Sequence, residues 1–142
     1  AGGYTNSPTG THFNTIEFVT VATTGNASDF GDLTAATKNL AGCSNSTRGL
    51  TGGGQSPSNT NVINFITIAS TGNATDFGDR TVSVEQLTGT SDPTRGLFAG
   101  GNPFTDVIDF VEIATTGDAT DFGNLTDGRR GAAGASNGHG GL

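Results

Sequence analysis

The sequence predicts an all-β protein of three antiparallel repeats, each with three or four short strands and about 47 residues. Composition is the first observation: Gly, Thr, Asn and Ser make up about half of the 142 residues, while Met and Trp are absent. Gly and Thr are poor helix formers, which excludes a helical domain. A recurring sequence block is the second observation, and such self-similarity is typical of repeat architectures.

The recurring block extends from Ile16 to Gly31 and returns at 63–78 and 108–123, at intervals of 47 and 45 residues. A second block, Thr47 to Gly53, returns at 94–101. A low-complexity coil would not keep two blocks in register. We therefore expect one repeat domain spanning 1–142, with the cores 16–62, 63–107 and 108–142, the last completed by 1–15.

Each block begins with a strand whose two faces both carry apolar side chains. In the second copy Ile63 and Phe65 share one face, while Ile66 and Ile68 lie on the other, which indicates a strand covered on both sides. A turn and one large aromatic residue follow, so each block supplies several core positions. The expected buried residues are Ile16, Phe18, Val21, Phe30, Ile63, Phe65, Ile68, Phe77, Ile108, Phe110, Ile113 and Phe122.

A hairpin is expected after each block. Leu40 to Cys43 and Arg48 to Gly52 flank a polar turn at Asn45-Ser46, and the third copy places Gly131 to Ala135 before the hairpin signal Asn137-Gly138. Cys43 is the single cysteine and cannot form an internal disulfide, so we interpret it as a small buried hydrophobe.

The two ends of the sequence complete one pattern. His139-Gly140-Gly141-Leu142 joined to Ala1-Gly2-Gly3 reproduces the pattern of 95–101 with no residue missing. A closed threefold ring, subunits that complete each other's strand, or a window on a longer tandem array would each produce this. We predict that the two ends form an assembly site, either within one chain or head-to-tail between copies, because an unpaired strand edge is a template for association.

Glycine doublets end a strand in two copies, and an aromatic residue follows each Ile-x-Phe strand: the doublets are Gly52-Gly53 and Gly100-Gly101, the aromatics Phe30, Phe77 and Phe122. These features resemble kelch repeats, the four-stranded blades of β-propellers, although the kelch Trp is replaced by Phe. The consensus Thr-Gly-Asn-Ala-Thr-Asp-Phe-Gly-Asp also resembles tandem repeats of predicted structural proteins of bacteriophages and environmental sequences. The resemblance implies an extracellular or virion-surface fibre. Three blades do not close a propeller, and a closed β-trefoil or β-prism is the alternative fold.

Several residues are candidates for binding or modification. Asn26, Asn45, Asn73 and Asn124 begin Asn-x-Ser/Thr patterns that would accept glycans in a secreted chain. The oxygen-rich segment 73–79 and its copies suit calcium, but turn formation explains them equally well, so we predict no metal and no other cofactor. Tyr4, Phe13 and Phe104 occupy matching loops and are the candidate sugar-binding platform.

The remaining features favour a structural role. The two histidines do not recur at equivalent places, no nucleophile–base pattern or phosphate loop is present, and we predict that the chain is not an enzyme. Six basic residues and a net charge of −7 disfavour nucleic acid, and no apolar run is long enough for membrane insertion. Arg48 and Arg95 recur with His139 in the third place, and pairing with a repeated Asp such as Asp76 is the expected role. We predict a structural filament or fibre module whose partners are copies of itself, with a lectin-like, glycan-binding module as the alternative.

Overall fold

A computed structural model describes residues 1–5 and 10–136, and in these residues the fold is all-β with no helix. The prediction of an all-β protein is confirmed. The twelve strands are β1 (Gly3–Tyr4), β2 (His12–Phe13), β3 (Thr15–Phe18), β4 (Ser28–Asp32), β5 (Ala41–Ser44), β6 (Arg48–Gly52), β7 (Val62–Thr67), β8 (Thr75–Asp79), β9 (Thr88–Ser91), β10 (Arg95–Ala99), β11 (Val107–Glu112) and β12 (Thr120–Asn124).

Two four-stranded antiparallel sheets carry the second and third copies of the block. Their strand orders are β5-β6-β7-β8 and β9-β10-β11-β12, so chain neighbours are also sheet neighbours. Both sheets have an irregular register at the same place, after Ile63 and after Ile108. The expected hairpin of the second copy is confirmed, with Cys43 opposite Leu50. Equivalent sequences therefore form equivalent sheets.

The first copy forms two separate two-stranded sheets, β1-β2 and β3-β4. The irregularity after Ile16 in the β3-β4 pair matches the one in the two larger sheets. Within the described residues, no strand equivalent to β5 or β6 pairs with β3, so the first copy shows only the strand pair that corresponds to β7-β8.

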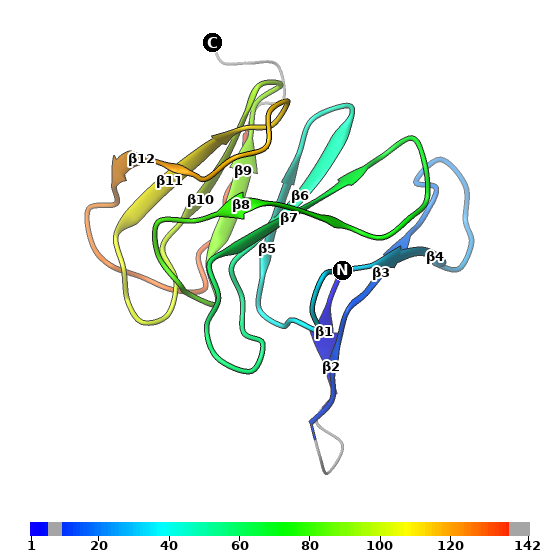
Figure 1. The fold of residues 1–142 in the computed structure, drawn as a ribbon, viewed down its shortest axis with the longest axis horizontal. Coiled ribbons are helices and arrows are strands. Elements are labelled where there is room, and N and C mark those ends of the chain that lie inside the picture. The colour runs from blue at the N-terminus through cyan, green and yellow to red at the C-terminus, as the bar shows by residue number, and fades with distance from the viewer. Residues whose placement is uncertain (6–9, 137–142) are drawn as a thin grey trace.

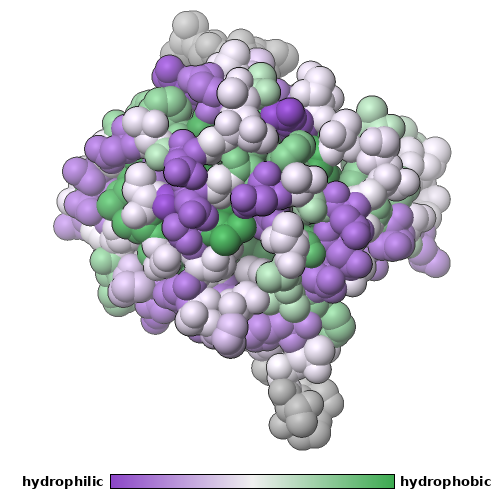
Figure 2. All heavy atoms as spheres, viewed as in Figure 1, coloured by the Kyte–Doolittle hydropathy of each residue, from purple (hydrophilic) through white to green (hydrophobic). Residues whose placement is uncertain are grey.

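The sheets follow one another in a row, with β9 to β12 at one side, β5 to β8 in the middle and β1 to β4 at the other side (Figure 1). The first strands of the two large sheets, β5 and β9, are direct neighbours. The main core lies between these sheets and is built around Leu50, Ile63, Phe98 and Ile113. On the face seen in Figure 2, apolar residues lie in small patches among polar ones. The described strands form no closed barrel.

The predicted core is confirmed in part. Ile16, Phe30, Ile63, Phe77 and Ile113 are buried, and Phe65, Ile108 and Phe110 are half-buried. The prediction was wrong for Phe18, Val21, Ile68 and Phe122, which are exposed. Equivalents of Val21, Ile68 and Phe122 are buried elsewhere in the chain, as Ile113 and Phe77 are, so the sequence pattern identified the repeat but not the exposure of each copy.

The glycine doublets need one correction. The residues with left-handed backbone are Gly53-Gly54, with φ of 65° and 104°, equivalent to Gly100-Gly101 with 64° and 133°. Gly52 lies in β6 opposite Ile63 instead. A Cβ on Gly100 would lie 2.6 Å from the Arg129 carbonyl oxygen, which agrees with the expected intolerance of a side chain there.

The predicted strand Gly131 to Ala135 is absent, since residues 131–136 form no strand. In the other copies this segment pairs with the strand that follows it, as β5 pairs with β6. The residues that follow this segment, 137–142, lie outside the described part of the chain, and they include the predicted turn at Asn137 and Gly138. In the described part, no helix is long and apolar enough to span a membrane.

Candidate assembly interfaces

Neighbouring copies are joined by hydrogen bonds that occur twice in the same form. The Gly72 amide donates to the Phe30 carbonyl oxygen at 2.7 Å, and the Gly117 amide donates to the Phe77 carbonyl oxygen at 2.7 Å. Two residues further along, Ala74 N donates to Asp32 O at 2.7 Å and Ala119 N donates to Asp79 O at 2.8 Å. The turn of each copy therefore attaches to the last strand of the copy before it.

An acceptor side chain in the same turn repeats as well. Asn73 Oδ1 accepts from the Asp32 amide at 3.0 Å, and Asp118 Oδ1 accepts from the Asp79 amide at 2.9 Å. This bond gives the repeated Asn or Asp of the block a structural role between copies. It also occupies an oxygen of the segment considered for calcium, and the described residues include no group of three or more acidic, His or Cys side chains suited to a metal ion.

The first strands of the two large sheets, β5 and β9, and the segment 131–136 meet through a row of glycines. Gln86 N donates to Asn39 O at 2.8 Å, as Gly131 N does to Gln86 O at 2.8 Å. A Cβ on Gly89 would lie 2.6 Å from Gly42 O, and one on Gly134 would lie 2.8 Å from Gly89 O. Residues 42, 89 and 134 are equivalent, so the absence of a side chain at this position lets β5, β9 and the segment 131–136 approach one another closely.

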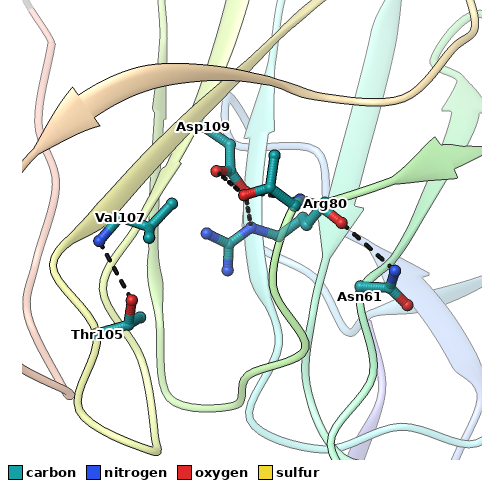
Figure 3. Close-up of polar contacts among 6 residues, drawn as sticks. Asn61, Arg80, Thr105, Val107 and Asp109 are labelled. Atoms are coloured by element: carbon teal, nitrogen blue, oxygen red, sulfur yellow. Dashed lines mark hydrogen bonds and ion pairs between the residues drawn. The ribbon is translucent and has the colours of Figure 1, made fainter.

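A buried ion pair adds to the contact between the second and third copies. Arg80, just after β8, donates from Nε to Asp109 Oδ2 on β11 at 2.9 Å, and both side chains are fully buried (Figure 3). Thr81 donates from its hydroxyl to the other Asp109 oxygen at 2.7 Å. Burial lowers the pKa of the Arg80 guanidinium below its usual value, and the charge of Asp109 opposes that shift. Sequence reasoning missed this pair, because the positions equivalent to Arg80 are Leu33 and Leu125.

The contact between the first and second copies uses neutral groups at the same places. Thr34 donates its hydroxyl to the Asn64 side-chain oxygen, as Thr81 does to Asp109. Leu33 stands at the position of Arg80 and is buried in a small cluster with Ile16 and Phe30. The two interfaces thus have the same geometry but different polarity. This indicates that the position of these groups matters more than their charge for the contact between copies.

The exposed fractions of two sets of equivalent residues change in opposite directions from the first copy of the block to the third. The equivalent residues Val21, Ile68 and Ile113 are 95%, 44% and 0% exposed. Arg48 of the preceding four-stranded sheet reaches the Ile113 carbonyl oxygen at 2.9 Å. The sheets before Ile68 are two-stranded, and within the described residues no earlier copy of the block lies before Val21. One end of the molecule therefore exposes the face that a preceding copy covers elsewhere.

The aromatic residue near the end of the block shows the opposite trend, because its exposed fraction is highest in the third copy. Phe30 and Phe77 are 8% and 3% exposed, but Phe122 is 54% exposed. Each of the three makes an edge-to-face contact with the aromatic residue of its own sheet, at centroid distances of 5.9–6.0 Å. Within the described residues no further copy of the block follows Phe122, so the far end exposes the complementary face.

The predicted terminal assembly site is described on one side only. Gly2 N donates to Thr15 O at 3.0 Å and Gly3 N to Thr37 O at 2.9 Å. The doublets at 53–54 and 100–101 make the same two bonds at 2.8–3.1 Å. Ala1 to Gly3 thus take the place of a strand end, while His139, Gly140, Gly141 and Leu142 lie outside the described residues.

The four candidate glycan acceptors have different surroundings. Asn26 and Asn124 are exposed, whereas Asn73 bonds to the neighbouring copy through its side chain. Asn45 caps its turn by accepting from the Thr47 and Arg48 amides at 2.9 Å, and its Nδ2 donates to Pro93 O at 3.2 Å. Asn45 therefore has a turn-forming role, and glycan acceptance at these positions stays a prediction.

The recurrent arginines stack on aromatic rings instead of pairing with Asp76. Arg48 lies 4.7 Å from the Phe65 centroid and Arg95 lies 4.6 Å from the Phe110 centroid. Arg95 also pairs with Glu112 at 2.8 Å on the exposed surface. Of the two arginines, only Arg48 has a recorded hydrogen bond to a neighbouring copy within the described residues, to the Ile113 carbonyl oxygen.

The three candidate sugar-binding aromatic residues lie in different local structures. Tyr4 and Phe13 lie in β1 and β2, not in loops, and Gly3, not Tyr4, is the strand partner of Phe13. Phe104 lies in the loop of the third copy with Arg130 at 5.1 Å from its ring centroid, while Lys38 lies 4.8 Å from the Tyr4 centroid.

Cys43 is half-buried and free, and burial raises the pKa of its thiol to about 12.

No family model matches this sequence, and no curated protein matches it. Function is therefore inferred from the contacts between copies of the block. Those contacts occur twice inside the chain, and their two unmatched halves lie at its opposite sides (Figure 1).

Proposed function

We propose that this chain is a non-enzymatic structural repeat module of an extracellular filament or a virion fibre, and that it assembles head-to-tail with copies of itself. The opposite exposure of Val21 and Phe122 carries this proposal. Val21 is 95% exposed while its equivalent Ile113, which follows a four-stranded sheet, is buried, and Phe122 is 54% exposed while Phe30 and Phe77, which each precede another copy of the block, are buried. Exposed apolar faces of this kind mark association sites, and two different faces that fit each other produce a chain of subunits.

The same proposal includes the architecture of the repeat. Each four-stranded sheet is one kelch-like blade, with β5 and β9 as the inner strands and β8 and β12 as the outer ones. Consecutive strand order and the close inner strands support this assignment. Residues Ala1 to Gly3 then supply the end of a strand whose beginning comes from residues 139–142 of a neighbouring copy, as the pattern shared with 95–101 suggests.

The structural role is better supported than glycan binding. A sugar stacks on the open face of an aromatic ring, and cations lie over the rings of Tyr4 and Phe104. The interface contacts, in contrast, are repeated in detail. The extracellular or virion setting follows from the resemblance to bacteriophage tandem repeats, and soluble glycans remain the alternative partner.

Sedimentation velocity over a hundredfold concentration range, followed by negative-stain electron microscopy, tests the proposal. We expect the sedimentation coefficient to rise with concentration and the micrographs to show linear or ring-shaped particles. A single species of 14.2 kDa at every concentration would contradict the proposal. Binding of the same monomer to a glycan array would then favour the lectin-like alternative.

A further inference from the structure

We propose that the β12 edge of one copy of the whole chain binds the segment Gly25–Ala27 of a second copy of the chain. The register is the one that joins neighbouring copies of the sequence block inside a single chain. This inference rests on the proposed head-to-tail assembly and specifies its contact, which is separate from the split terminal strand. Gly25–Ala27 is equivalent to 72–74 and 117–119, the two turns already bound to a preceding strand. Within the described residues, no other copy of the block reaches Gly25–Ala27.

The register defines three hydrogen bonds between copies. Gly25 N and Ala27 N of the second copy donate to the Phe122 and Asn124 carbonyl oxygens, as Gly117 and Ala119 do to 77 and 79. The Asn124 amide donates to Asn26 Oδ1, as the Asp32 amide does to Asn73. This arrangement covers the exposed ring of Phe122 and gives Asn26 the same function as its equivalents.

Charges on the two faces are complementary in this register. Thr126 is equivalent to Thr34 and Thr81, whose hydroxyls donate to the side chains of Asn64 and Asp109. The residue equivalent to Asn64 and Asp109 in the first copy is Glu17, so its carboxylate meets Thr126 of the neighbouring copy. Arg129 Nη2 already lies 3.1 Å from the Thr126 hydroxyl oxygen. An Arg–Glu pair between copies then takes the place of the internal Arg80–Asp109 pair.

The inner strands supply an independent part of the same contact. A Cβ on Gly89 would meet the Gly42 carbonyl oxygen, but a Cβ on Gly42 would meet only Leu50 O at 3.5 Å, an ordinary distance. In the assembled row, Gly42 of the second copy faces Gly134 of the first copy at the same close separation. A side chain at position 42 is therefore compatible with the isolated chain and incompatible with the assembly.

Matched substitutions at equivalent positions test the register. Asn26→Ala should weaken self-association by about fivefold, the effect of one hydrogen bond, and leave urea unfolding of the dilute chain unchanged. Asn73→Ala, the control, should lower the unfolding midpoint and leave self-association within twofold of wild type. Gly42→Ala should weaken association by at least tenfold.

A charge exchange tests which side chains meet. Glu17→Arg and Arg129→Glu should each weaken self-association by about tenfold, and mixing the two variants, or combining them in one chain, should restore it. Glu112→Arg changes the net charge equally on the exposed surface and serves as the control.

The outcomes separate the two proposals. A wild-type chain that never associates overturns the proposed function and the inference together. A wild type that associates, while Asn26→Ala, Gly42→Ala and both charge variants associate as tightly, overturns only the register proposed here. Restoration in the double exchange together with the loss in Gly42→Ala supports it.

Discussion

The middle of the molecule and its two ends are built from the same sequence block but differ in burial. Between the second and third copies, Phe77, Phe98 and Ile113 are almost fully buried, and even an ion pair is excluded from water. At the ends, Phe122 and Val21 present the same kinds of side chain to solvent. A single copy cannot cover both of its faces, so the burial of each residue depends on its neighbours and not only on its own strand.

Truncation of the repeated phenylalanine should show this difference most strongly. Phe77→Ala removes a buried ring and should lower the free energy of unfolding by about 3–5 kcal/mol. Phe122→Ala, at the equivalent exposed position, should change it by less than about 1 kcal/mol. Urea unfolding of dilute protein measures both, and equal losses would show that the two positions are not distinguished by a neighbouring copy.

The buried ion pair provides the second test. Asp109→Ala leaves the Arg80 charge buried without its partner and should cost about 3–5 kcal/mol. The double variant Arg80→Leu with Asp109→Asn copies the Leu33 and Asn64 arrangement of the neighbouring interface and should have nearly wild-type stability. Thermal unfolding of both variants decides this, and a double variant as unstable as Asp109→Ala would mean that the two interfaces are not equivalent.

The glycine row predicts a smaller effect. Gly89→Ala places a methyl group against the Gly42 carbonyl and should destabilise the dilute chain by about 1–3 kcal/mol. Gly42→Ala should change its stability by no more than about 0.5 kcal/mol. Neither glycine has a left-handed backbone, so the comparison isolates the close contact. Chemical denaturation gives both values, and a large loss in Gly42→Ala would be inconsistent with the open face at that position.

The turn at Asp92 predicts the smallest effect, one that depends on pH. Hydrogen bonds from the Arg95 and Thr94 amides hold the pKa of Asp92 below its ordinary value of 3.8. A lowered pKa in the folded state contributes stability that is complete above about pH 4 and declines as pH falls through the folded value. Asn45 makes the same turn without a titratable group. Asp92→Asn should therefore reduce the loss of stability between pH 4 and pH 2. The midpoint of urea unfolding, measured over this pH range for both proteins, checks this prediction.

Much of the repeat itself could be predicted from the sequence. The spacing of the blocks, the strand at Ile63 and the hairpin around Asn45 follow from local patterns that physical preferences translate directly into strands and turns. Phe122 and Val21 could not be predicted as exposed, because their surroundings depend on a copy that the local pattern does not show. The Arg80–Asp109 pair was missed for a related reason: the two residues are 29 positions apart, and Arg80 replaces Leu at a position where the repeat predicts an apolar side chain.

Hydrogen exchange at the amides of the repeated turn tests the account most directly. Gly72 and Gly117 donate to the preceding copy inside the chain, so their amides should exchange slowly at every protein concentration. Within the described residues, Gly25 N has no such acceptor, and its amide should exchange fast in dilute protein and slow at concentrations where sedimentation shows assembly. A Gly25 amide that stays equally fast in the assembled protein would contradict the claim that the two ends meet through the contact already present between the copies.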